Sequence, residues 1–355
     1  MALGDILRTA WRRIKEPVLA GRGNLVQRMA YRSLVRVVKR CKKSVSATDL
    51  GDLALWLMYH PESRVLPCEG WKMTSPPDFG ADEMVRLRER YRADMAAVER
   101  RLSLETVVPE TFLGSWRQDV RIAVHVHSFF PEIFPRIHKA LECIPVPFDL
   151  FVSVPDGISI PAELDGAERC AIVRCPNRGR DIAPFLCLFG RRLMDYDYVA
   201  HFHSKKSPHV AENGDWLGHS LNHLLGGVNR VKGILGALDS GYGIVAPPEF
   251  SPTSEDPTGW MRNLHQAQAL VRLGGVDIDL ARDFMPIPFP KGSMFWARSD
   301  FLRRFFALPL SFEDFPEEPI GIDGTPAHAL ERLFFLWGMG TGLKVGRLAE
   351  VYDVR

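Results

Sequence analysis

The chain has 355 residues, of which 46% are hydrophobic and 25% are charged, and its formal net charge is +2. This composition is that of an ordinary globular protein with a sizeable core, and it argues against a chain that depends on disulfide staples. No run approaches the roughly 18 uninterrupted apolar residues of a membrane span, and no cleavable signal pattern opens the sequence. The six cysteines form no CxxC pair, which favours reduced thiols over a disulfide framework or a zinc site. We therefore expect a cytoplasmic protein, either soluble or peripherally bound to the inner membrane.

The amino-terminal segment, residues 1–45, carries the basic excess of the chain. Its net charge is +10, which leaves −8 for residues 46–355. In "LVQRMAYRSLVRVVKRCKK" basic residues recur at helical spacing beside an apolar stripe. Such a helical arm is typical of an anchor on an anionic membrane surface, although a helix packed on the main domain, or a partly disordered arm, has the same pattern. Nucleic acid is not expected as a partner, because the body is acidic and contains no recognisable nucleic-acid module.

Residues 46–117 read as a helical region with a linker. A short apolar segment precedes the proline-rich connector "SPPDFGADE", which indicates a linker. The charged stretch that follows, residues 81–102, has acidic residues in its first turn and predicts a helix. The main domain is then expected over residues 118–355.

From residue 118 onward, predicted strands alternate with predicted helices. The strands are expected at residues 120–129, 148–155, 170–176, 198–203, 242–248 and 292–298, and the helices at 131–144, 182–194, 218–238, 259–274 and 326–337. This alternation predicts an α/β domain with a mostly parallel sheet and flanking crossover helices. Ligands of such sheets bind outside the carboxyl ends of the strands, so the residues that follow each strand are the first candidates for a site.

The stretch "CPNRGRDIAPF" follows the strand at 170–176 with a dense group of polar residues: Asn177, Arg178, Gly179, Arg180 and Asp181. The glycine permits a tight turn close to a ligand. The arginines offer forked donors suited to phosphates. Asp181 is suited to hold a sugar hydroxyl, but the same residue is a good N-cap for the next helix, paired with Arg178. We interpret the group as part of a ligand site.

The stretch "HFHSKKSPH" follows the strand at 198–203 and adds His203, Lys205 and Lys206. In a parallel sheet these cations lie at the same edge as the two arginines, an arrangement that suits an anionic group such as a diphosphate. A solvated loop, with one histidine satisfied in the core, is the alternative. His201 and His203 face one side of the sheet and are a possible pair of metal ligands. We find no third ligand with convincing spacing, so a divalent metal is the less favoured interpretation.

Two downstream stretches supply further candidates. "PFPKGSMFWARSDF" contains Trp296, which is suited to stack on a sugar ring but sits in a strand where aromatics are more often core. "FEDFPEEPIGIDGTPAHALERLFF" gathers several carboxylates ahead of a predicted helix. Glu317, Glu318 and Asp323 are candidates for a general base, though solvated acids and helix caps look alike. His328 and Glu331 are three residues apart and therefore share one helix face.

Four motifs in this order, "NRGRDIAPFL", "HFHSKKS", "KGSMFWAR" and "DGTPAHALERLF", resemble the rhamnan synthesis protein F family of bacterial polysaccharide glycosyltransferases over about residues 118–350. The resemblance implies a GT-A-like nucleotide-binding α/β fold. It also implies transfer of a sugar from a nucleotide-sugar donor to a lipid-linked cell-surface glycan of O-antigen, rhamnan or capsule type. Many GT-A enzymes bind a divalent metal through an Asp-x-Asp motif. Here "DYD" at 195–197 precedes its strand and so lies at the wrong edge, and we expect side-chain cations to replace the metal and no firm cofactor.

The resemblance gives each candidate residue a role in an inverting transferase. Asp323 is the first choice for the base, with Glu317 and Glu318 as alternatives, and Trp296, His328 and Glu331 would contact the acceptor. The donor would be bound by Asn177, Arg178, Gly179, Arg180, Asp181, His203, Lys205 and Lys206. The main alternative is a catalytically inactive scaffold that binds glycan or nucleotide in an assembly complex. A phosphotransferase is disfavoured by the absence of a GxxxxGK[ST] loop.

Overall fold

The structure, a computed structural model, describes residues 55, 58, 59, 81–160, 167–205, 215–250, 258–321 and 323–350. The basic segment 1–45 lies outside the described residues, so its proposed membrane role rests on sequence alone. The chain divides into two compact units, residues 1–92 and 93–355. In the first unit, Leu55, Met84 and Leu87 form a small buried cluster.

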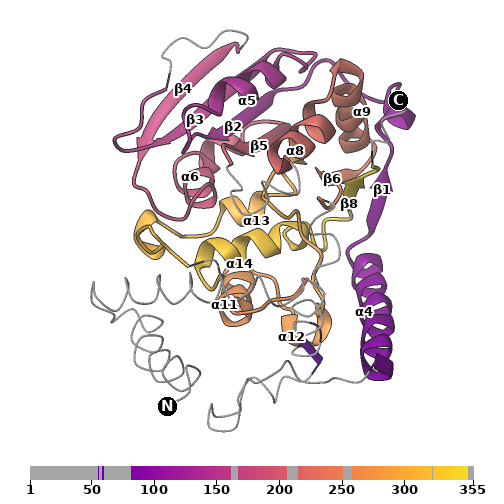
Figure 1. Cartoon of the computed structure of the whole chain (residues 1–355). Coiled ribbons are helices and arrows are strands. Elements are labelled where there is room, and N and C mark those ends of the chain that lie inside the picture. Colours follow the sequence, from indigo (N-terminus) through magenta and orange to yellow (C-terminus); the bar gives the residue numbers. More distant parts are fainter. Residues whose placement is uncertain are drawn as a thin grey trace. The chain divides into compact units, whose positions relative to one another are not determined.

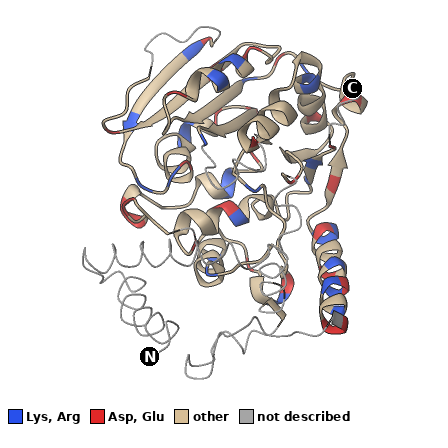
Figure 2. Cartoon of the chain, viewed as in Figure 1, with Lys and Arg blue, Asp and Glu red and all other residues tan. Residues whose placement is uncertain are grey.

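Helix α4 (Ala81–Arg101) confirms the charged helix predicted over residues 81–102. Acidic side chains stand in its first turn and arginines in its last, where each complements the helix dipole. Charges of both signs run along the helix in Figure 2. Near its carboxyl end, Val98 is buried in a hydrophobic core of the second unit.

A single eight-stranded sheet organises the described part of the second unit, in the order β1-β8-β6-β7-β5-β2-β3-β4 (Figure 1). All neighbouring pairs are parallel except those of β7, which is antiparallel to both β5 and β6. Seven strands therefore point the same way and β7 alone is reversed. The strands are β1 (Leu104–Val107), β2 (Ile122–His127), β3 (Phe148–Pro155), β4 (Arg169–Cys175), β5 (Tyr198–His203), β6 (Tyr242–Ala246), β7 (Phe295–Arg298) and β8 (Lys344–Leu348).

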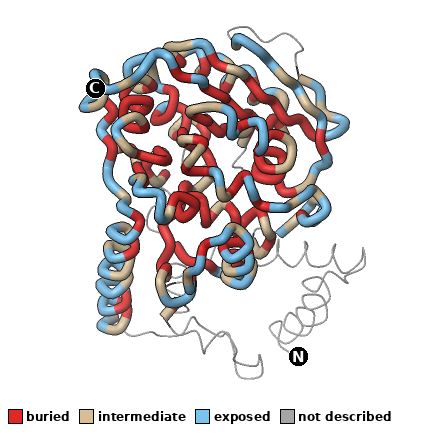
Figure 3. Tube along the Cα trace, turned by 180° about the vertical axis from the view of Figure 1, so that it is seen from behind, coloured by how far each residue is buried: buried red, intermediate tan, exposed pale blue. Residues whose placement is uncertain are grey.

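Helices cover both faces of the sheet. Side chains alternate between the two faces along each strand, so each face presents apolar residues that a layer of helices buries. On β2, Ile122, Val124 and Val126 belong to one buried cluster, whereas Ala123 belongs to the other. The interior of the sheet is buried in Figure 3. The first cluster, which contains Ile122, Val124 and Val126, also contains residues of α5 (Phe134–Leu141), α8 (Trp216–Leu225) and α9 (Val228–Asp239). The second cluster, which contains Ala123, also contains residues of α6 (Ile182–Cys187), α11 (Leu264–Leu273), α12 (Leu280–Asp283), α13 (Arg303–Phe306) and α14 (Pro326–Leu333).

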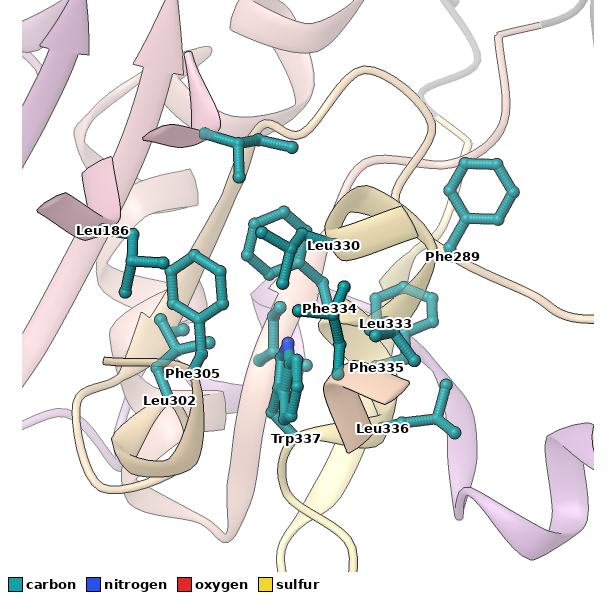
Figure 4. Close-up of a cluster of buried hydrophobic side chains, with 14 of the residues drawn as sticks. Leu186, Phe289, Leu302, Phe305, Leu330, Leu333, Phe334, Phe335, Leu336 and Trp337 are labelled. Atoms are coloured by element: carbon teal, nitrogen blue, oxygen red, sulfur yellow. The ribbon is translucent and has the colours of Figure 1, made fainter. Parts of the chain in front are cut away.

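The second cluster is rich in aromatic rings (Figure 4). The ring centroids of Phe305 and Phe334 lie 5.2 Å apart, and Trp337 packs against Phe305 at 6.1 Å. Thr325 is the N-cap of helix α14 and Pro326 is its first residue. Threonine is favoured at the N-cap and proline at the first helical position. The apolar face of α14, with Leu330 and Leu333, is buried in this cluster, which fixes the orientation of its opposite, polar face.

The fold class predicted from the sequence, a mostly parallel α/β sheet with flanking helices, is confirmed. The sequence did not predict β1 and β8, which are short and lack a continuous apolar run. The sheet therefore begins before residue 118. The helix predicted over 218–238 is two helices, α8 and α9, because Gly226 and Gly227 separate them. In the part of the chain that the structure describes, no helix combines the length and apolar composition needed to span a membrane.

Phe334 is fully buried in the aromatic cluster. Truncation to alanine is therefore expected to lower the free energy of unfolding by about 3–5 kcal/mol, through lost burial and a residual cavity. Leu273, which is 52% exposed, is the matched control, and Leu273→Ala should change stability by no more than about 0.5 kcal/mol. Urea unfolding measures both; equal losses in the two variants would contradict the assigned core.

Candidate active site

Loops from four separate parts of the chain meet at the carboxyl edge of the sheet. Strands β2, β4 and β5 end there, and the reversed β7 begins there, so the segment before β7 joins the same edge. Between these loops is a cavity of about 470 Å³, which we call the carboxyl-edge cavity. The four motifs of the sequence each line it. The predicted site residues brought together are Asn177, Arg180, Asp181, His203, Lys205, Glu318, His328 and Glu331.

Gly292 connects the segment before β7 to the end of β5 and to α14. The Nε2 of His203 donates to the Gly292 carbonyl at 2.8 Å. The Gly292 amide donates to Oε1 of Glu331 at 2.9 Å. The glycine has a φ of +90°, in the region that favours a residue without a side chain. The segment before β7 is thus held between the end of β5 and the polar face of α14.

Lys205 supplies a cation to the carboxyl-edge cavity. Its Nζ lies 3.3 Å from the centroid of the Trp216 ring, within the range of a cation–π contact. Burial lowers the pKa of Lys205 to about 8, while the nearby carboxylates of Glu331 and Asp181 oppose that shift. The amine is therefore mostly protonated at neutral pH, and its positive charge is only partly hydrated.

The turn after β4 is held in an uncommon backbone conformation. Gly179 and Arg180 have φ values of +64° and +56°, and a Cβ at Gly179 would overlap Ala183 and Phe315. Ser293, also at the cavity, has a φ of +57°. Positive φ at residues other than glycine is found preferentially at ligand sites. The guanidinium of Arg180 lies at the cavity, with Nη2 donating to the Gly321 carbonyl at 3.2 Å.

A buried chain of polar side chains lies beneath the cavity. Asp181 Oδ2 is 3.2 Å from His201 Nε2, and His201 Nδ1 is 2.9 Å from His125 Nδ1. Ser153 Oγ then lies 2.9 Å from both His125 Nε2 and His127 Nδ1. This series of hydrogen-bonded side chains crosses β5, β2 and β3 and returns to the cavity at His127. It joins the turn after β4 to the centre of the sheet.

Burial and mutual hydrogen bonds set the charge states of these buried side chains. Burial lowers the pKa of His127 to about 3 and lowers the pKa of His201 as well, so both imidazoles are neutral at physiological pH. For Asp181, burial alone would raise the pKa, but His203 and the hydrogen bond from His201 outweigh it and hold the pKa below its usual range. Asp181 therefore remains a carboxylate, which suits a fixed charge better than a general base.

His328 presents an unsatisfied ring nitrogen at the cavity wall. Its Nδ1 is 2.7 Å from Thr325 Oγ1, while its buried Nε2 has no hydrogen-bond partner among the described residues. Burial lowers its pKa to about 4, with the nearby Arg180 acting in the same direction. Buried polar atoms are usually hydrogen-bonded, so this nitrogen is available to a ligand in the cavity.

Three predicted donor-binding residues are not placed at the cavity. Arg178 pairs with Glu317 at 2.5 Å and the two residues form a β-bridge, so this pair fastens the turn to the segment after η4 (Phe312–Asp314). Gly179 lies behind the turn against Phe315. Lys206 lies outside the described residues.

The structure corrects the roles predicted for Asp323 and Trp296. Asp323 accepts from the Asn263 side chain at 2.6 Å and from the Arg262 amide at 3.1 Å, and it pairs with Arg332 at 3.1 Å. Both of its oxygens thus hold structural contacts away from the cavity lining. Trp296 is fully buried and donates to the Leu224 carbonyl at 3.2 Å, so its ring is core and cannot stack on a sugar.

The buried histidine chain was missed in the sequence, although a signal for it exists. "HVHS" at 125–128 and "HFHS" at 201–204 are near-repeats. In the sheet they lie side by side, with His125 opposite His201 and His127 opposite His203. The predicted position of "DYD" is confirmed: Asp197 accepts from the Arg121 amide, directly before β2, at the amino edge of the sheet.

Comparison with known proteins identifies the family. The sequence model described as rhamnan synthesis protein F matches residues 87–340. The chain belongs to the rhamnan synthesis protein F family. This membership supports a role in polysaccharide biosynthesis. The match begins before residue 118, where the sequence motifs placed the start of the domain, and so includes β1 and most of α4.

Two curated relatives match part of the chain. Each is described as uncharacterized protein WxcX, from Xanthomonas campestris pv. campestris strains B100 and ATCC 33913, and each is 37% identical over 200 residues. That region is 55% of this chain but 26% of each relative, so the chain spans about a quarter of their length. Among solved structures, "Crystal Structure of a Mycobacterial Protein" covers 71% of this chain and 73% of that chain, with 14% identity and a TM-score of 0.33. A similarity this low assigns no function to this chain.

Asp323→Asn separates the structural role of this carboxylate from a catalytic one. The amide would place a donor opposite the donors of Asn263 or Arg332, and we expect a loss of about 1–3 kcal/mol in the free energy of unfolding. Asp277→Asn, at an exposed position, is the control and should be neutral. An Asp323→Asn variant with wild-type unfolding free energy would contradict the structural assignment.

Proposed function

We propose that the carboxyl-edge cavity binds a nucleoside diphosphate sugar and that the protein is an inverting glycosyltransferase of GT-A-like fold. The observation that carries the proposal is the meeting of Arg180, Lys205 and His328 around one cavity at the carboxyl edge of the sheet. Ligands of open α/β sheets bind at that edge. Family membership supplies the polysaccharide context, and the residues supply the chemistry.

The cations of the cavity would bind the donor diphosphate. Glycosyl transfer breaks the bond between the sugar and the diphosphate, and negative charge develops on the departing oxygen. A partly buried ammonium stabilises such charge more strongly than a fully hydrated one, because the local dielectric is lower. Lys205 has this character, and Arg180 adds a second cation at the same cavity. We propose that these side chains compensate the diphosphate without an Asp-x-Asp metal site.

Glu318 is the best placed general base among the predicted carboxylates. It lines the cavity, and its Oε2 accepts from the Ile320 amide at 2.7 Å, which orients the group. Both carboxylates lie beside a cation of the cavity: Glu331 is close to Lys205, and Glu318 Oε1 lies 3.7 Å from Arg180 Nε. Glu331 also accepts from the Gly292 amide and thereby holds the segment before β7 in place. We therefore assign proton abstraction from the acceptor hydroxyl to Glu318 and positioning of the Lys205 loop to Glu331.

The proposed acceptor is a lipid-linked glycan at the cytoplasmic face of the inner membrane. An amino-terminal arm with a net charge of +10 would bring the domain to an anionic leaflet. A transfer assay tests the whole proposal: purified full-length protein is incubated with labelled nucleotide sugars, with and without membrane lipid extract. Transfer to lipid or hydrolysis of the donor supports the enzyme. Donor binding without either reaction in any combination would support the inactive scaffold instead.

Donor affinity should depend on pH through Lys205. The diphosphate diester of a nucleotide sugar does not titrate near neutral pH, so the relevant change is loss of the ammonium as pH rises through about 8. We expect constant affinity from about pH 6 to 7 and weaker binding above about 8. Calorimetric titration of the wild type and of Lys205→Met across this range measures the effect.

Lys205→Met should bind donor about tenfold or more weakly at pH 7, because it loses a charge-assisted hydrogen bond, and its affinity should no longer fall above pH 8. The matched control is Lys139→Met on the exposed surface of α5, which should behave as the wild type. Unchanged affinity or an unchanged pH profile in Lys205→Met would remove Lys205 from the donor site.

Glu318→Gln tests the base. Loss of a general base is expected to lower kcat by a factor of about 10²–10⁴. Donor affinity should not fall, because the substitution keeps Arg180 and Lys205 and removes only the negative charge that lies 3.7 Å from Arg180 Nε. Glu168→Gln, at an exposed position before β4, is the matched control and should keep wild-type turnover. Near-normal turnover in Glu318→Gln, with turnover lost in Glu331→Gln, would transfer the role to Glu331.

A further inference from the structure

A second group of polar side chains lies at the carboxyl ends of β6 and β8. His219 and His223 are four residues apart on α8 and therefore share one face of the helix. Glu350 follows β8 by two residues. One ligand atom from each of these three residues lies within 4.8 Å of the other two. None of the three lines the carboxyl-edge cavity.

Backbone contacts determine which ring nitrogens of the two histidines carry a proton. His219 Nε2 lies 3.1 Å from the Pro248 carbonyl, and His223 Nδ1 lies 2.8 Å from the His219 carbonyl. A carbonyl only accepts, so each of these nitrogens carries the proton of its neutral imidazole. The other nitrogens, Nδ1 of His219 and Nε2 of His223, then carry lone pairs. Metal-binding histidines are held in the same way, with the second ring nitrogen donating to a carbonyl or carboxylate.

These contacts bring three electron-pair donors together. Nε2 of His223 lies 3.6 Å from Oε2 of Glu350, and neither atom has a proton to offer the other in this tautomer. A cation between them removes the repulsion. An additional proton on His223 is one such cation, but the side chain is only 5% exposed and burial disfavours an imidazolium. For a tetrahedral zinc ion with bonds of about 2.0–2.1 Å, two ligand atoms lie about 3.4 Å apart. The distance of 3.6 Å between His223 Nε2 and Glu350 Oε2 is close to this value, and the ligand atom of His219 lies within 4.8 Å of both residues' ligand atoms.

We propose that His219, His223 and Glu350 bind a divalent transition-metal ion of the zinc type. Two imidazoles and a carboxylate are a ligand set that zinc favours. Three protein ligands leave a fourth position, which water would occupy because Glu350 is half exposed. The ion would join α8 to the end of β8 and so fix α8 against the edge of the sheet.

This metal site is separated from the donor cavity by aromatic rings. The Phe250 ring lies 5.3 Å from that of His219 and stacks on Trp216 at 5.6 Å. The Lys205 ammonium also contacts Trp216, with its Nζ 3.3 Å from the ring centroid. The ion therefore supports the helix that carries Trp216 and does not contact the diphosphate position.

Metal binding to the purified full-length chain tests the proposal directly. The protein is stripped with a chelator and titrated with zinc, and separately with cobalt, whose visible absorption reports tetrahedral coordination by nitrogen and oxygen. We expect one bound equivalent at this site and a rise in melting temperature with zinc, because the ion binds the folded state. Glu350→Gln and His219→Gln should each weaken zinc binding at least about tenfold and abolish the tetrahedral cobalt spectrum.

The decisive variant is Glu350→Gln, because its half-exposed side chain can be changed without opening a core cavity. His265→Gln, at an exposed position on α11, is the matched control and should bind zinc as the wild type does. Absence of zinc binding in the wild type, or equal affinity in Glu350→Gln and the wild type, would overturn the proposal. The readout is metal binding alone, so the result is independent of what the carboxyl-edge cavity binds.

Discussion

The buried contact between Asp181 and His201, at 3.2 Å, holds the whole carboxyl edge in place. A buried carboxylate is stable only where hydrogen bonds and nearby positive charge compensate its lost hydration. Asp181 meets that condition only while the turn after β4 lies against the end of β5. The geometry of Arg180 and the position of the adjacent cavity follow from this contact. The further links through His125, Ser153 and His127 extend it across three strands.

The reversed strand β7 completes the edge. If it ran parallel to its neighbours, the loop containing Gly292 would lie at the opposite edge of the sheet. Because it is antiparallel to β5 and β6, that loop reaches both His203 and Glu331. Helix α14 then contributes two faces with different functions: an apolar face buried among aromatic rings and a polar face at the cavity. Packing and site geometry are thus coupled through a few elements.

The sequence predicts those parts of the fold whose residues carry a strong local pattern. The alternating apolar runs of β2, β3, β4 and β5 gave the parallel sheet, and the carboxyl-edge rule brought Arg180 and Lys205 together. Tertiary contacts decided the rest. Asp323 and Glu318 look alike in sequence, yet their tertiary contacts differ. Asp323 is held by Arg332 and by Asn263, which is distant from it in sequence, whereas Glu318 lies at the cavity beside Arg180. The Trp296 side chain points into the core and not into the cavity, because its position along β7, rather than its residue type, decides which face of the sheet it lies on.

The central claim is that the carboxyl edge, rather than the amino edge, binds the donor diphosphate. The amino edge has a rival pocket of about 350 Å³, where Arg117, Arg121 and Arg303 lie beside "DYD". A crystal structure of the protein with a bound nucleoside diphosphate distinguishes the two most directly. Our account predicts diphosphate oxygens within about 3.2 Å of Lys205 Nζ and beside the Arg180 guanidinium. A diphosphate bound among the amino-edge arginines, with the carboxyl-edge cavity containing only water, would contradict it.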